Sequence, residues 1–277
     1  MIDDPNLTLL NDCLAGKPKA LEDLIKIFQP KVFALSLKFL WDPDEAEDAT
    51  QEILIKIITH LAGFRKESKL STWVYRVATN HLINIKKSKS ESRTIRFHTV
   101  ERELKKSNAT PESEPENLPY LVHNIQGACT HAMLLCLTRP YRIAYLLGEV
   151  FQVTNEEGSW ILEISNELYR KRLSRARKQM DEFLGKQCGL TNANNPCSCK
   201  NRIQYVSKRG RINQYLELSE SLRNSGAHKK LQPMMPEVRT IRKAAEVFRN
   251  GPEFRPRNQN LEMIQNLIKN KNSKIFN

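Results

Sequence analysis

Residues 44–87 form two successive segments whose side chains carry opposite chemistry. In the first, DEAEDATQEILIKIITHLAGF, apolar residues return every three or four positions, which is typical of one side of an α-helix, and acidic residues fill the other side. Pro43 stands where a helix begins. The second segment, FRKESKLSTWVYRVATNHLINIKK, mixes aromatic, amide and basic side chains. The pair predicts a helical bundle with two chemically distinct surfaces. The predicted buried stripe is Ala46, Ala49, Ile53, Ile57 and Leu61.

Almost every periodic segment of the 277 residues has helical spacing, which predicts an all-α fold. Two helices fit the residues from Leu10 to Leu40, and we expect Pro30 to begin the second. The stretch SNATPESEPENLP is polar, acidic and proline-containing, as in a flexible linker. The sequence therefore predicts a helical unit at 1–92, an acidic linker at 93–126, a second helical unit at 127–184 and a C-terminal extension at 185–277.

A short helix at 156–162, a tight turn at 163–165 and a strongly basic helix at 166–180 have the layout of a helix-turn-helix. The second helix of that motif lies in the DNA major groove, with its first residues facing base edges. The alternative is a solvated basic helix on the surface of a bundle. We expect Leu168, Leu173, Ala176 and Met180 to face inward. The predicted base-edge residues are Ser165, Asn166, Glu167 and Arg170, and the predicted phosphate contacts are Lys171, Arg172, Arg175 and Lys178.

The overall charge and the lack of targeting signals narrow the class of protein. A net charge of +13 favours a polyanionic partner, most simply nucleic acid. No apolar run is long enough to cross a bilayer, and MIDDPNLTLL is unlike a secretion signal, so we expect a cytoplasmic protein with no membrane partner. We also expect no enzyme, because phosphate-binding glycine loops and activated nucleophile motifs are absent, and His81, His98 and His123 lack evident partners.

Several short motifs resemble those of a known protein family and follow one another in the same order as in that family. EAEDATQE at Glu45–Glu52, FRKES at Phe64–Ser68 and STWVYRVATN at Ser71–Asn80 resemble region 2 of the extracytoplasmic-function group of bacterial RNA polymerase sigma factors. RKRLSRARK at Arg170–Lys178 resembles the end of region 4 of the same group. The resemblance covers roughly residues 10–183. It implies a factor that binds core RNA polymerase and directs promoter recognition and opening.

The resemblance also implies a role for each surface. The acidic face would bind the clamp helices of the largest polymerase subunit, and the aromatic segment would hold bases flipped from the promoter. Trp73 and Tyr75 have an alternative as ordinary core residues. An anti-sigma factor is a further partner that the group allows. The implied polymerase-binding residues are Glu45, Asp48, Gln51 and Glu52. The implied single-strand residues are Phe64, Lys66, Ser71, Trp73, Tyr75, Arg76 and Asn80.

The sequence departs from the family pattern at the turn of the predicted helix-turn-helix. Glu163 stands where a glycine is common, and it adds negative charge near the DNA. Gly158–Ser159 replaces an aliphatic–alanine pair, and a glycine inside a helix costs about 1 kcal/mol relative to alanine. The other function that the residues allow is a stand-alone helix-turn-helix regulator with a metal- or redox-responsive extension. That alternative leaves the acidic helix unexplained.

Cysteines gather near the start of the C-terminal extension, in CGLTNANNPCSCK. Three thiols within twelve positions, Cys188, Cys197 and Cys199, are candidate ligands for zinc or a softer metal. A fourth ligand would come from Cys129, His131 or Cys136 if the extension folds back. The alternative is reduced structural thiols, and the predicted function requires no cofactor. Farther on, helices are expected at 237–249 and around Leu261–Ile268.

Overall fold

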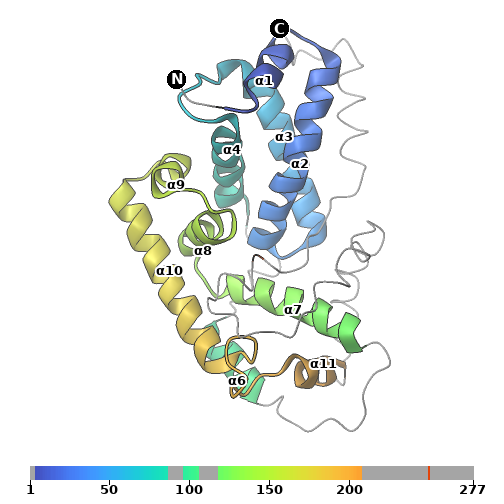
Figure 1. Cartoon of the computed structure of the whole chain (residues 1–277), viewed down its shortest axis with the longest axis vertical. Coiled ribbons are helices and arrows are strands. Elements are labelled where there is room, and N and C mark those ends of the chain that lie inside the picture. Colours follow the sequence, from blue (N-terminus) through green and yellow to red (C-terminus); the bar gives the residue numbers. More distant parts are fainter. Residues whose placement is uncertain (1–3, 87–95, 106–117, 208–248, 250–277) are drawn as a thin grey trace. The chain divides into compact units, whose positions relative to one another are not determined.

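The computed structural model describes residues 4–86, 96–105, 118–207 and 249. Within these ranges every secondary-structure element is helical, apart from one isolated bridge between Cys188 and Cys197 (Figure 1). The all-α prediction is confirmed. Contacts divide the chain into two units, and helix α10 passes from one to the other. The first unit holds the described residues up to 86 with Thr154–Tyr169, and the second holds those of 96–153 and 170–249.

The first unit is built around three helices that bury their apolar stripes against one another. Its elements are α1 (Leu7–Leu14), α2 (Pro18–Leu40), α3 (Pro43–His60), the short helix η1 (Leu61–Gly63), α4 (Leu70–Asn84) and α9 (Asn155–Leu162). The five residues of the predicted α3 stripe are all buried, so that prediction is confirmed. Helix α3 begins at Pro43, as expected, and α9 packs against α4.

The predicted helix start at Pro30 is wrong, because Pro30 lies inside α2. The break between the first two helices falls earlier, at Ala15–Lys17, and Pro18 occupies the first turn of α2. A proline in a helix interior removes one backbone hydrogen bond. Phe28 and Phe33 on either side are buried, so core packing holds the helix together across this position.

The second unit contains a helix that the sequence did not predict. Its elements are α6 (Phe97–Lys105), α7 (Leu118–Leu135), α8 (Arg139–Tyr145), the π-helical turn η2 (Leu146–Val150), α10 (Asn166–Gln187, from Arg170 onward) and α11 (Cys199–Ser207). The expectation of irregular structure over 93–126 is therefore wrong for α6 and for the first half of α7. Leu104 anchors α6 by burial, and Glu103 accepts a hydrogen bond from Tyr205 at 2.5 Å.

One buried cation holds the junction between α7 and α8. Arg142 donates hydrogen bonds to the carbonyl oxygens of Leu134 at 3.0 Å and Leu137 at 3.1 Å. The last carbonyls of a helix lack partners within the helix, so the bond to Leu134 satisfies one of them at the end of α7. The bond to Leu137 holds the segment that follows α7. Pro140 lies in the first turn of α8, where its missing N–H costs no helical hydrogen bond. The junction therefore fixes where α8 begins.

Helices α9 and α10 form where they were expected, but their packing differs at one point. Leu168, predicted to face inward, is exposed, and the neighbouring Tyr169 is fully buried. The ring of Tyr169 lies against Gly158 so closely that a Cβ there would be 2.2 Å from its Cζ. The missing side chain at Gly158 thus makes room for the tyrosine, and that contact sets which face of α10 turns inward. Leu173, Ala176 and Met180 are buried as predicted.

Two further predictions concern the C-terminal part and membrane spans. The helices expected at 237–249 and around Leu261–Ile268 lie outside the described residues, except for Arg249. Among the helices that the structure describes, none has the length and apolar character needed to span a membrane.

Candidate functional site

The four predicted polymerase-binding residues lie on the side of α3 opposite its buried stripe. Asp48 and Glu52 are exposed, and Glu45 and Gln51 are partly exposed. Asp42 caps the helix, accepting hydrogen bonds from the backbone N–H groups of Asp44 and Glu45, both at 3.1 Å. Such a cap and the acidic first turn are both favoured at a helix N-terminus. The stripe and the cap together hold this face at a fixed orientation on the first unit.

A buried histidine, which the sequence left without a partner, lies directly beneath the acidic face. His81 on α4 accepts a hydrogen bond at Nδ1 from Lys56 Nζ at 2.8 Å, and its Nε2 is 3.8 Å from Glu52 Oε2. The expectation that His81 lacks partners is therefore wrong. Burial lowers the pKa of His81, the nearby Lys56 ammonium lowers it further, and the Glu52 carboxylate opposes both. The imidazole consequently stays neutral between α3 and α4.

Acid should destabilise the packing of α3 on α4 through His81. The unfolded chain binds a proton at the ordinary histidine pKa near 6.5, whereas the folded chain resists it. The stabilisation is therefore complete above about pH 6.5 and is lost as the pH falls through the lowered pKa. We expect α3 and α4 amides to exchange hydrogen faster, relative to the intrinsic rate, as the pH falls from 7.5 to 5.5. In His81→Gln this dependence should shrink, and an unchanged dependence would contradict the assignment.

The predicted single-strand residues come from the loop before α4 and from α4 itself. Phe64 is buried, with its ring centroid 5.4 Å from that of Trp73, so it packs the loop onto the helix and offers no open face to a base. Lys66 has a left-handed backbone, with φ of 58°, and its Nζ donates to Asn11 Oδ1 at 3.2 Å. Asp4 anchors the start of α4 by accepting from Leu70 N at 2.6 Å. No pattern in the sequence indicated this role for Asp4.

On α4 the predicted residues are partly exposed and lie near the surface. Ser71, Trp73, Tyr75, Arg76 and Asn80 all fall in this class. Burial raises the pKa of Tyr75 to about 12, so its hydroxyl remains a neutral phenol at physiological pH. Arg76 pairs with the carboxylate of Glu163, and its Cζ lies 4.4 Å from the centroid of the Trp160 ring. Trp160 lies in α9 and Glu163 directly follows it, and both belong to the first unit.

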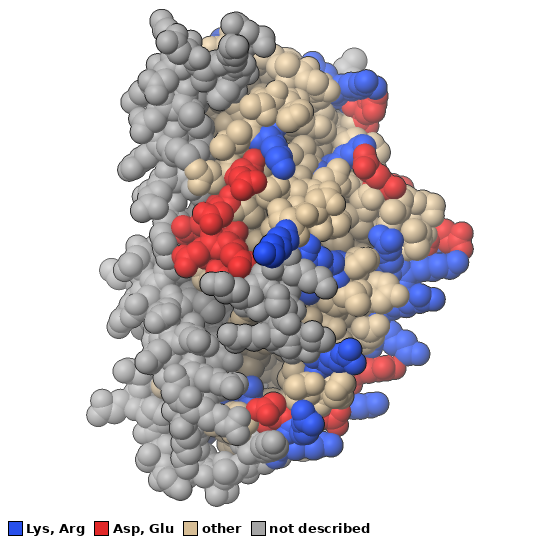
Figure 2. Space-filling view, turned by 180° about the vertical axis from the view of Figure 1, so that it is seen from behind, with Lys and Arg blue, Asp and Glu red and all other residues tan. Residues whose placement is uncertain are grey.

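The predicted duplex-binding residues lie along the first four turns of α10. Figure 2 shows Lys and Arg side chains standing out at its right edge, along the helix that Figure 1 labels α10. Glu167, Arg170, Lys171, Arg175 and Lys178 are exposed, and Asn166 and Arg172 are partly exposed. The exposed Ser165 caps α10 by accepting from Leu168 N at 3.2 Å. Helix α10 therefore presents a basic surface whose first turn is fixed by a local cap.

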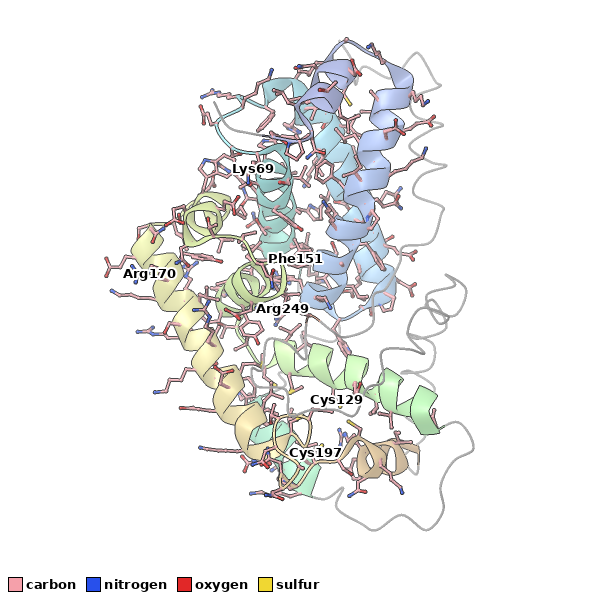
Figure 3. The ribbon with its side chains drawn as sticks, in the orientation of Figure 1. Lys69, Cys129, Phe151, Arg170, Cys197 and Arg249 are labelled. Carbon is pink, nitrogen blue, oxygen red and sulfur yellow. The ribbon has the colours of Figure 1, made fainter. Side chains whose placement is uncertain are left out.

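Two of the basic residues on α10 are held by neighbours in the second unit. Arg175 Nη1 donates to the Tyr141 hydroxyl at 3.3 Å. Arg177, which was not among the predicted contacts, pairs with Glu149. Lys178 Nζ lies 3.9 Å from Glu182 Oε1, an exposed pair of the kind that contributes little to stability. Arg170 and Lys171, nearer the start of α10, are exposed, and Figure 3 shows Arg170 at that end of the helix.

The cysteine loop folds back on α7 in the second unit, as the fourth-ligand prediction required. Cys129 on α7 lies near Cys188, Cys197 and Cys199, and ionised thiolates at these positions would repel one another. Figure 3 shows Cys129 on α7 and Cys197 just before α11. Cys136 is not in this cluster, since its Sγ donates to Ala132 O at 3.7 Å. The structure thus brings Cys129, and not Cys136, close to the loop cysteines, and the side chain of His131 lies outside the described residues.

All four thiols are free and partly buried. Cys129 and Cys199 pack against the buried pair Ile125 and Ile203, and Arg202 donates a hydrogen bond to the Cys129 thiol. Burial raises the pKa of Cys197 to about 12, and it also raises the pKa values of the other three. Within the described ranges, no group of three His, Cys, Asp or Glu side chains is arranged to hold a metal ion.

The loop at 188–198, which carries Cys188 and Cys197, supplies hydrogen-bond donors to the end of α10. The side-chain amide of Asn195 donates to the carbonyl oxygens of Gly185 and Cys188, both at 2.9 Å, and Thr191 Oγ1 donates to Leu184 O at 2.6 Å. The last carbonyls of a helix need such partners. The loop at 188–198 therefore acts as a side-chain cap, and the Asn-rich composition was its only signal in the sequence.

Comparisons with known proteins identify a family model and several relatives that this chain resembles. The family described as Sigma-70 region 2 matches residues 24–91. The RNA polymerase sigma-H factor of Pseudomonas aeruginosa is 28% identical over 173 residues, covering 61% of this chain and 88% of the relative. The ECF RNA polymerase sigma factor SigW of Bacillus subtilis is 28% identical over 176 residues, covering 61% and 91%.

A third relative and one solved structure complete the comparison. The ECF RNA polymerase sigma-E factor of Escherichia coli is 28% identical over 169 residues, covering 60% of this chain and 87% of the relative. The structure of CnrH in complex with the cytosolic domain of CnrY aligns with a TM-score of 0.47 at 16% identity. That alignment covers 64% of this chain and 96% of the other. Each relative's alignment covers most of that relative's length and leaves more than a third of this chain unmatched.

Proposed function

The chain belongs to the extracytoplasmic-function group of RNA polymerase sigma factors, and on that premise we propose how its surfaces divide the work of transcription initiation. The acidic face of α3 binds core RNA polymerase through Glu45, Asp48, Gln51 and Glu52. The surface of α4 holds unpaired promoter bases, and α10 contacts duplex DNA. The factor supplies binding free energy, and the polymerase performs the chemistry.

The observation that carries this proposal is that acidic side chains gather on one face of α3 and basic side chains gather along α10, each on its own helix. The carboxylates of α3 stand on a capped helix with a fully buried stripe, so they form a preset acidic surface for a protein partner. The basic residues of α10 begin one turn after the Ser165 cap, where a helix-turn-helix presents side chains to the major groove. Phosphate contacts position such a helix, and base-edge contacts specify the sequence.

The remaining predictions follow from this role. We propose that the factor acts in the cytoplasm with core polymerase and promoter DNA as partners. An anti-sigma factor is a further partner that the group allows, and no residue is assigned to it. The stand-alone regulator is the weaker alternative, because it leaves the acidic face of α3 without a use.

Transcription from purified components tests the proposal. Core polymerase should gain specific start sites on genomic fragments of the source bacterium when the full chain is added, as mapped from transcript 5′ ends. Replacing Arg170 and Lys171 with alanine should weaken transcription from these sites, because both cations lie exposed on the duplex-binding helix. Start sites no different from those of core polymerase alone would reject the proposal.

For the cysteine cluster we propose a structural role that requires no cofactor. Zinc at Cys188, Cys197 and Cys199 was the alternative, and a metal assay on anaerobically purified full-length protein separates the two. We expect no stoichiometric metal and normal promoter-specific transcription in Cys188→Ser, because burial raises the pKa of all four thiols and so keeps them in the protonated form. One zinc ion per chain, lost in Cys188→Ser, would instead establish the metal site.

A further inference from the structure

Arg76 on α4 is engaged by two different groups of the α9 segment at the same time. Its guanidinium pairs with the Glu163 carboxylate and lies over the indole ring of Trp160, 4.4 Å from the ring centroid. One turn earlier on α4, the Thr72 hydroxyl donates to Glu157 Oε1 at 3.4 Å. All of these residues belong to the first unit, so the contacts do not depend on how the two units are placed.

The Glu163 carboxylate and the Trp160 ring make the same two kinds of contact with Arg76 that a nucleotide would make, an ion pair and a stacking contact. A carboxylate stands where a phosphate would pair with the guanidinium, and an indole stands where a base would stack on it. We propose that α9 is a latch that occupies the strand-binding surface of α4 by imitating a nucleotide. This inference rests on the proposed single-strand role of α4. The free factor then cannot hold an unpaired strand until α9 leaves α4.

The backbone at Glu163 supports a specific role for its carboxylate. This residue ends α9 in the left-handed conformation, with φ of 53° and ψ of 42°. Glycine adopts that conformation without strain, whereas a residue with a Cβ does so less readily. The chain therefore keeps a carboxylate at a position where glycine would be the easier residue. The resulting side chain reaches the one arginine of α4.

The latch is weak enough to be released by a competing polyanion. The Arg76 side chain is 31% exposed and that of Glu163 is 52% exposed, so water and salt reach the ion pair. Ion pairs of this kind change an equilibrium by only about two- to fivefold. The start of α10 up to Tyr169 also belongs to the first unit. Release of α9 would therefore free the first turn of the duplex-binding helix as well as the surface of α4.

Replacing Glu163 with glutamine tests the latch in the full-length protein. Glu163→Gln removes the charge and keeps the size, and Glu156→Gln is the matched control, because it removes the same charge from an exposed α9 position. Glu157 is left intact, since it also forms the capping box with Thr154. The probe is a short fluorescent oligo(dT), and the second readout is hydrogen exchange of the α9 amides.

We expect Glu163→Gln to bind oligo(dT) about two- to fivefold more tightly than Glu156→Gln, with faster exchange of the α9 amides. Equal affinities and equal exchange in the two variants would overturn the latch. Faster exchange without tighter binding would also overturn it, because α9 would then leave α4 without uncovering a strand site. The binding assay contains no polymerase. If the two variants fail this test while the full chain still directs specific transcription, only the latch is rejected. Absent specific transcription rejects the proposed function instead.

Discussion

Asp48→Lys with Glu52→Lys should weaken binding of the factor to core RNA polymerase by about tenfold or more. Both carboxylates are exposed on the acidic face of α3, and like charges brought together at an interface cost several kcal/mol. A loss of about 1.4 kcal/mol already corresponds to tenfold in affinity. Titration of labelled factor with core polymerase measures the effect.

The matched control for this double reversal lies on α2. Glu22→Lys with Asp23→Lys changes the net charge by the same amount, and both residues pair only loosely with Lys26, at 4.0 and 3.7 Å. Affinity for duplex DNA should change equally in the two double variants, because it responds to total charge. Thermal unfolding of both checks that the loss of Glu52 beside His81 has not unfolded the first unit. If the α3 and α2 double variants bound core polymerase equally well, α3 would not be part of the polymerase interface.

Gly158→Ala should destabilise the junction of α9 and α10, although alanine is the better helix former. A Cβ at this position would lie 2.2 Å from Tyr169 Cζ, and Tyr169 is fully buried. Overpacking of a buried contact costs about 1–3 kcal/mol, which exceeds the propensity gain of about 1 kcal/mol over most of that range. We expect faster hydrogen exchange across α9 and weaker duplex binding.

Gly185→Ala is the control that isolates the steric cause. Gly185 also lies inside a helix, α10, and nothing is within 4 Å of where its Cβ would be. The same substitution should therefore stabilise α10, by about 0.5–1 kcal/mol. If the two alanine variants shifted stability in the same direction, the contact between Gly158 and Tyr169 would not be the cause.

The parts of the fold that the sequence predicted are those set by local periodicity. The α3 stripe, the α9 helix and the inward residues Leu173, Ala176 and Met180 recur at helical spacing, and burial follows that spacing. Pro30 misled the prediction because α2 is held by its packing on both sides of the proline. Helix α6 was missed although its apolar residues do recur at helical spacing, because it is only nine residues long and buries a single residue deeply, Leu104.

The parts that the sequence did not predict depend on contacts between distant residues. Tyr169 replaces Leu168 as the inward residue because Gly158, on another helix, leaves room for its ring. The pairing of Arg76 with Glu163 joins positions 87 residues apart, and neither residue's neighbours indicate it. The same is true of His81, whose partners Lys56 and Glu52 come from α3. The roles assigned to the individual site residues stay predictions until binding is measured.

Permanganate reactivity of unpaired thymines tests most directly whether this chain opens promoters. The DNA should be a fragment that carries a start site mapped with the full chain and core polymerase. The account predicts reactive thymines just upstream of the start site only when both proteins are present, and a loss of that reactivity with Asp48→Lys and Glu52→Lys. Equal reactivity with core polymerase alone would contradict the account.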